Sequence, residues 1–183
     1  MRKDSANSLR IFICALLLSL LLCAGSCSYR LVNPIGEHIS RDIQKVYVDV
    51  FANNTSEANI ETEFRNAFVD QFIKGRRFKV VNNREIADAI LKGEIANLVT
   101  APLAYRGTQN IAVKKKITVT MSLTLTTSNA ATILWQDKSF TQWEDFDLGV
   151  GTFDTARGNQ QNALSKLAKD AAERAYRMMN SDF

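Results

Sequence analysis

The feature that most constrains the fold is a run in which apolar and hydroxyl-bearing side chains alternate strictly. Between residues 117 and 126, aliphatic residues and methionine occupy the odd positions, and threonine or serine occupies the even ones. Successive side chains of a β-strand point to opposite faces, so the run predicts a strand with one buried face and one hydroxyl-rich solvent face. We expect this strand to span 111–127 and to return through a hairpin at 128–131.

Shorter runs rich in β-branched and aromatic residues predict the other strands. Gly93 interrupts one of them, which indicates a bulge or a close approach of another group to the backbone. Together with the long strand, the segments expected in the sheet are 43–51, 76–81, 89–99 with an extension to 105, 111–127 and 132–143.

Two segments carry apolar side chains at three- and four-residue steps and predict helices over 57–74 and 159–179. Thr55 or Ser56 is expected to cap the first helix, because a hydroxyl at that position can accept a bond from a free backbone N–H group. Gly75 is expected to end it.

The order of these elements is strand, helix, several strands and helix. Two helices packed on one face of a mostly antiparallel sheet of four or five strands form an α+β two-layer sandwich. We expect one such domain over 42–183. The acidic segment 145–157, which contains glycine and aromatic residues, is predicted to be a mobile loop before the last helix.

The N-terminus has the three parts of a secretory signal peptide. Arg2, Lys3 and Arg10 are basic, an almost wholly apolar run covers 11–22, and small residues follow. The apolar run is shorter than the roughly 20 residues that a membrane-spanning helix requires. We therefore expect residues 1–26 to be removed.

Cys27 follows the small residues of 24–26, and this pattern is similar to the lipobox at which bacterial lipoproteins are cut and acylated. Cleavage between Ser26 and Cys27 would leave a cysteine able to carry diacylglycerol and palmitate, with 27–41 as a lipidated tether. Leucine is commoner than alanine at the position of Ala24. The alternative is an ordinary signal peptide and a free thiol.

The composition and the motifs of the chain argue against a nucleic-acid-binding protein and against an enzyme. The net charge of the chain is +4. The predicted signal peptide contains three basic residues and one acidic residue, so the domain that follows it is only weakly basic. His38 is the only histidine and falls in the tether, so a nucleophile would lack a histidine base. Gly149 and Gly151 lack the third glycine of a dinucleotide loop, and no cysteine and histidine spacing fits zinc. We expect no catalytic residue, cofactor or metal.

Two basic clusters open predicted strands: Arg76 with Arg77, and Lys114 with Lys115 and Lys116. Such clusters attract lipid phosphates through charge-assisted hydrogen bonds. Lysines at the edge of a sheet also protect it against unwanted strand pairing, and the residues alone favour this second interpretation.

Four short motifs occur in a fixed order along the chain: CSYRL at 27–31, VYVDVFANNT at 46–55, ADAILKGEI at 87–95 and ILW at 133–135. Their order and spacing resemble those of the LPS-assembly lipoprotein family, LptE. Ser28 stands where that family usually has glycine.

The resemblance implies an outer-membrane lipoprotein that sits as a plug in the lumen of the LptD β-barrel and helps that barrel assemble. LptD inserts lipopolysaccharide into the outer leaflet, and some family members bind lipopolysaccharide themselves. The protein would be lipid-anchored, at the periplasmic face and in the barrel lumen. A hydroxyl-rich strand face suits a wet lumen, and the lysines of 114–116, with Arg76 and Arg77, become possible contacts for lipid A phosphates.

Two other functions remain open. A small lipoprotein domain of this class could be a scaffold of another envelope assembly system. It could also be a lipid carrier, which would need a deep apolar cavity. Fold alone does not separate these functions.

Overall fold

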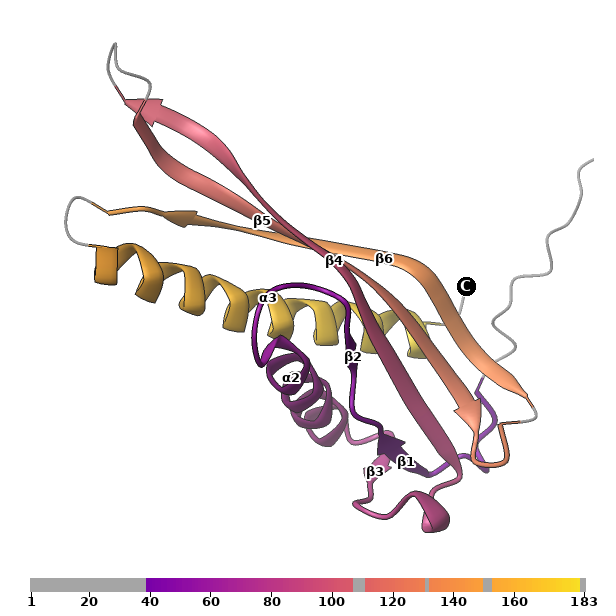
Figure 1. Ribbon diagram of the computed structural model, residues 1–183. Coiled ribbons are helices and arrows are strands. Elements are labelled where there is room, and N and C mark those ends of the chain that lie inside the picture. Colours follow the sequence, from indigo (N-terminus) through magenta and orange to yellow (C-terminus); the bar gives the residue numbers. More distant parts are fainter. Residues whose placement is uncertain (1–38, 107–110, 131, 150–152, 182–183) are drawn as a thin grey trace, which may run out of the picture. The chain divides into compact units, whose positions relative to one another are not determined.

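The structure is a computed structural model and describes residues 39–106, 111–130, 132–149 and 153–181. Its elements are β1 (Lys45–Val48), β2 (Ala52–Asn53), α2 (Ile60–Gly75), β3 (Lys79–Val80), a 3₁₀ turn (Arg84–Ile86), β4 (Ala89–Arg106), β5 (Ile111–Thr127), β6 (Ile133–Asp147) and α3 (Phe153–Asn180) (Figure 1). Within these ranges, no helix combines the length and the apolar character that crossing a membrane requires.

Three long strands, β4, β5 and β6, form an antiparallel half of the sheet. The alternating run lies in β5, which is the central strand of the three. Its pairing with β4 and β6 is antiparallel, as its pattern predicts. All five of its odd residues are completely buried: Ile117, Val119, Met121, Leu123 and Leu125. The periodicity of the sequence therefore fixes which face of this strand meets the core.

The other half of the sheet is parallel, which corrects the predicted architecture. The strand order is β3-β1-β4-β5-β6, with β2 also on β4, and β1 runs parallel to both β3 and β4. We expected a mostly antiparallel sheet of four or five strands, but the sheet is mixed and has six. The helix α2 carries the chain back along the sheet after β1, so the next strand starts from the same side and runs the same way.

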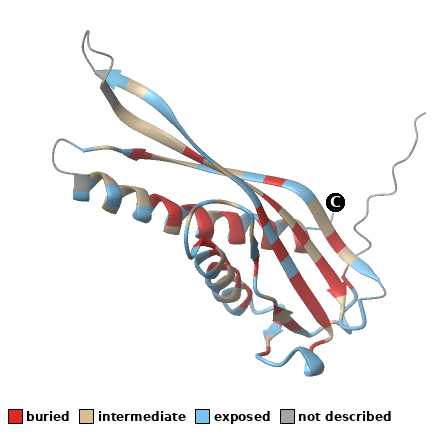
Figure 2. Cartoon of the chain, in the orientation of Figure 1, coloured by how far each residue is buried: buried red, intermediate tan, exposed pale blue. Residues whose placement is uncertain are grey.

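Both helices lie on one face of the sheet, as predicted (Figure 1). Helix α2 buries three aromatic rings four residues apart, Phe64, Phe68 and Phe72. Helix α3 contributes mainly small residues, including Ala171 and Ala175, so the two helices can approach each other and the sheet closely. Figure 2 shows the resulting core as a buried layer between helices and sheet.

Gly93 and Gly75 are glycines because aromatic rings occupy the space of a side chain. A Cβ atom on Gly93 would lie 2.5 Å from the ring of Phe51, which is itself buried. A Cβ atom on Gly75 would lie 2.2 Å from the ring of Tyr176. The close approach predicted at Gly93 is confirmed. At the end of α2, the left-handed residue is Arg76 (φ 58°), and Gly75 makes room for the tyrosine.

Several predicted boundaries are wrong, and the largest differences concern α2, β6 and α3. Helix α2 begins at Ile60, after Asn59 in a left-handed conformation, because Thr55 caps an earlier turn by accepting a bond from the N–H of Glu57. The predicted loop 145–157 is partly regular: β6 continues to Asp147 and α3 starts at Phe153. Opposite charges in the β5–β6 register favour the longer strand.

Candidate functional site

The face of the sheet that lies opposite the helices carries the candidate site, and we call it the open face. Its centre is the row of even residues of β5, which are partly exposed: Thr118, Thr120, Ser122 and Thr124. The register places Lys92 and Glu94 of β4 on one side of this row and Gln136 and Thr141 of β6 on the other. Neither helix covers this face (Figure 1).

Side chains of the open face bond to one another across the strands. The Oγ1 atoms of Thr120 and Thr141 lie 3.5 Å apart, and Nε2 of Gln136 donates to Oγ1 of Thr124 at 3.0 Å. Hydroxyl groups can both donate and accept, so the face can bond equally well to water, sugars or a polar protein surface.

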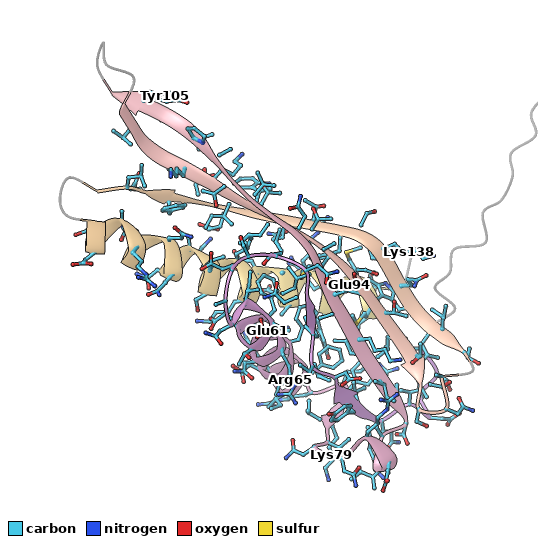
Figure 3. All side chains as sticks on the ribbon, viewed as in Figure 1. Glu61, Arg65, Lys79, Glu94, Tyr105 and Lys138 are labelled. Carbon is cyan, nitrogen blue, oxygen red and sulfur yellow. The ribbon has the colours of Figure 1, made fainter. Side chains whose placement is uncertain are left out.

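One end of the open face extends beyond the helices on a hairpin formed by the end of β4 and the start of β5 (Figure 1). Apolar side chains are exposed there: Val99 by 48%, Leu103 by 45% and Tyr105 by 56%. Figure 3 shows Tyr105 near the far end of this hairpin. Val99 lies opposite Thr118, which in turn lies opposite Trp143 of β6, so exposed apolar groups flank the hydroxyl row.

The register separates the three lysines that the sequence places together. Lys114 and Lys116 share the parity of Thr118 and lie on the open face, opposite Asp147 and Asp145 respectively. Lys115 has the other parity and pairs with Phe146, a buried residue on the helix side of the sheet. Only two of the three predicted lysines can therefore belong to a site on the open face.

The ammonium of Lys116 lies 4.2 Å from the centre of the Trp143 ring, an arrangement in which the ring stabilises the cation. Trp143 is 53% exposed. This end of the face thus combines two cations with exposed aromatic and aliphatic surface, although acids lie opposite both lysines. Such a mixture can contact an amphiphile that carries both phosphate and apolar groups.

Arg76 and Arg77 are not near these lysines. They follow α2 and precede β3, which lies at the other end of the sheet from the hairpin (Figure 1). Nη2 of Arg77 donates to the backbone oxygen of Ile39 at 2.6 Å, and its guanidinium lies 4.7 Å from the Phe78 ring centre. Arg77 therefore holds the segment that enters the domain, which gives it a structural role.

Several predicted features lie outside the described residues: the signal peptide, cleavage between Ser26 and Cys27, the lipid on Cys27, and His38. They stay predictions. The sequence argument overlooked Val99, Tyr105 and Trp143 as parts of a site. Strand parity alone would have placed Trp143 on the buried side with Trp135, because only a register shift between Asp137 and Phe140 moves it to the open face. The exposure of the hairpin depends on where the helices end.

Residues 43–179 match the LptE family, described as lipopolysaccharide-assembly. No curated protein matches the chain. Among solved structures, the hypothetical protein CT253 from Chlamydia trachomatis gives a TM-score of 0.52 at 9% identity, over 76% of this chain and 99% of that one. Rare lipoprotein B from Shewanella oneidensis gives 0.50 at 9% identity, over 74% and 93%.

At such low identity, these structural likenesses concern the fold alone: two helices against a mixed sheet. The family match is different in kind, because it covers well over half of the sequence. The family that the four motifs resemble is thereby confirmed, and this chain belongs to the LptE family of lipopolysaccharide-assembly proteins.

Proposed function

We propose that this protein is an outer-membrane lipoprotein, anchored through Cys27, that acts as plug and assembly partner of the LptD β-barrel in lipopolysaccharide insertion. The role is non-enzymatic and uses no cofactor. Family membership supports the pathway. The observation that carries the proposed contact is the open face, a helix-free and hydroxyl-rich surface along β4, β5 and β6.

A plug in a water-filled barrel needs a surface that tolerates both water and a protein wall. The hydroxyl row of the open face satisfies this need, because each hydroxyl can exchange a water partner for a protein one at little cost. The exposed hairpin residues would add apolar contact area at one end. Lys114 and Lys116 are the residues we propose for lipid A phosphates.

Affinity purification of the full chain from its own envelope membranes tests this function. We expect a large β-barrel protein to be recovered with it. Thr120→Arg, on the open face, should reduce that recovery. Asn66→Arg, which introduces arginine at an exposed position of α2, should leave the recovery unchanged. Recovery of a different envelope complex without the barrel would refute the proposed partnership.

A further inference from the structure

The outer edge of β4 is paired along only its first half. β1 and β2 lie along it as far as Ile95, whose carbonyl oxygen accepts a bond from the N–H of Asn54 at 3.0 Å. Beyond Ile95, no described strand pairs with this edge. β5 lies between this half of β4 and β6, so α3, which packs along β6, does not cover the edge (Figure 1).

The direction of the backbone groups in the unpaired half follows from the register. Ile95 points its carbonyl oxygen to β2, so odd residues face outward in the first half of β4. The register shifts between Ile95 and Asn97, which leaves Ala96 as an extra residue and reverses this alternation. Beyond the shift, Leu98 and Thr100 therefore face outward with both their N–H and C=O groups.

Pro102 agrees with this assignment. It lies two residues beyond Thr100 and also faces outward, where its missing N–H costs no bond to β5. We call residues 97–102 the β4 edge. It offers the N–H and C=O groups of Leu98 and Thr100 and the C=O group of Pro102, and no described group bonds to any of them.

The β4 edge lacks the charged side chains that commonly protect an exposed strand edge. Residues 95–105 read Ile-Ala-Asn-Leu-Val-Thr-Ala-Pro-Leu-Ala-Tyr, without a charge. The lysines of 114–116 lie on β5, which is an inner strand, so they do not occupy the edge. An uncharged edge with unpaired main-chain groups is a template for another strand.

The surroundings of the β4 edge indicate which kind of strand it accepts. A basic segment would be repelled by Lys114 and Lys116 on the neighbouring strand. An acidic segment would place carboxylates beside Leu98 and Val99, whose side chains offer no hydrogen-bond donor. An uncharged segment meets neither penalty.

A second copy of this chain fits the β4 edge less well. In an antiparallel pair centred on Thr100, Pro102 of each copy would lie opposite Leu98 of the other. Proline has no N–H, so both Leu98 carbonyl groups would stay unpaired. The pair would also bring Lys114 and Lys116 of both copies onto one face of a joint sheet. A segment of another protein that lacks proline avoids both penalties.

We propose that the β4 edge binds an extended, uncharged segment of a partner protein by strand addition. The outward groups of Leu98, Thr100 and Pro102 supply the main-chain bonds, and the absence of charge along the edge selects the segment. This interaction goes beyond the proposed function, because it involves neither the hydroxyl row nor lipopolysaccharide.

A synthetic heptapeptide that alternates threonine with valine is the probe, added to the full chain labelled with ¹⁵N and held in detergent. We expect amide hydrogen exchange to slow at Leu98 and Thr100, whose N–H groups face outward. Exchange at Val99 and Ala101 should stay unchanged, because these amides already face β5. Peptides with lysine or glutamate in place of threonine should bind about tenfold more weakly.

Three results would overturn the proposal. The first is equal or tighter binding of either charged peptide, and the second is the absence of slowing at Leu98 and Thr100. The third is slowing that rises with protein concentration in the absence of peptide, which would identify a second copy of the chain as the occupant.

Two variants separate the main-chain and charge contributions. Thr100→Pro removes one outward N–H and leaves the β5 ladder intact, so binding should weaken about tenfold. Val99→Lys keeps the backbone and should shift the preference to the glutamate peptide; this variant decides the matter if the proline variant does not fold. Ile133→Lys, a lysine at an equally exposed position of β6 (49% against 48%), should leave binding unchanged. Unaltered binding in both edge variants would contradict strand addition.

Discussion

Lys116 and Trp143 lie on adjacent strands of the open face, with the lysine ammonium 4.2 Å from the centre of the indole ring. Asp145 lies opposite Lys116 in the register, but the two side chains form no ion pair among the described residues. The ammonium of Lys116 is therefore not neutralised by this acid and can bind an incoming anion. The pair also places an exposed aromatic surface beside a positive charge. The contacts proposed for lipid A begin from this arrangement.

Replacing Lys114 or Lys116 by alanine should weaken binding of lipopolysaccharide to the full chain. Each loss removes one charge-assisted bond at a partly exposed site, so we expect about a fivefold effect per lysine. Titration of lipopolysaccharide against the purified protein at low and high salt measures this effect. The difference should shrink at high salt, because exposed charges are screened.

Lys115→Ala is the matched control for this prediction. It removes the same charge from the same strand, but its register with Phe146 places it on the opposite face. Binding should stay within twofold of the unchanged protein. If Lys115→Ala weakens binding as much as the other two changes, the effect comes from net charge and not from the open face.

Gly93→Ala should destabilise the fold by about 1–3 kcal/mol, because the added Cβ would overlap the buried ring of Phe51. Urea unfolding gives the free energy of unfolding for comparison. Gly158→Ala adds the same methyl group to α3 where nothing lies within 4 Å, and it should be neutral or stabilise by up to about 1 kcal/mol. Similar effects at both glycines would argue against the Phe51 contact.

Much of this core could be predicted because local patterns determine it. The alternation of β5 identifies its buried face, and the spacing of Phe64, Phe68 and Phe72 identifies that of α2. Gly93 predicts a close approach to the backbone but does not indicate which residue makes it, since Phe51 lies far away in the sequence. That partnership depends on β2 pairing with β4 in parallel, a tertiary feature without a local signal.

Arg77→Ala should loosen the segment that enters the domain without affecting lipopolysaccharide binding. Its guanidinium bonds the backbone oxygen of Ile39 and lies over Phe78, so its loss frees that segment. Limited proteolysis should show faster cleavage near Ile39. Arg76→Ala, at a neighbouring position without such a bond to Ile39, is the control. A fall in lipopolysaccharide affinity in Arg77→Ala alone would restore this residue as a lipid contact.

Asp88 stabilises the start of β1 in a pH-dependent way. Its carboxylate accepts bonds from the backbone N–H groups of Lys45 (2.7 Å) and Gln44 (3.0 Å), and these bonds lower the pKa of Asp88. Because the folded-state pKa lies below the unfolded one, the stabilisation is present above about pH 4 and is lost as pH falls through the folded-state pKa.

Asp88→Ala should therefore lower the free energy of unfolding by about 1 kcal/mol at pH 7, a value reduced by solvent screening of this exposed carboxylate. The difference between variant and unchanged protein should diminish as the pH falls below about 4. Urea unfolding at a series of pH values provides the curve. A difference that stays constant with pH would mean that packing, and not the charge, is responsible.

The candidate site was harder to predict than the core. The lysines of 114–116 are one cluster in the sequence, but strand alternation divides them between two faces, and this division follows from the sequence once the strand is recognised. The role of Arg77 does not follow, because Ile39 lies far from it in the chain. The place of β6 at the end of the strand order also has no local signature, since strand order is set by long-range pairing.

Site-specific photocrosslinking in cells tests the central claim, that the open face lies against the barrel. A photoreactive residue at Thr120 or Thr124 reports on this face, and one at Asn66 or Lys169 reports on exposed helix positions. The account predicts adducts with a large β-barrel protein that are several-fold stronger from the two threonine positions. No barrel adduct from the open face, or stronger adducts from the helices, would contradict it.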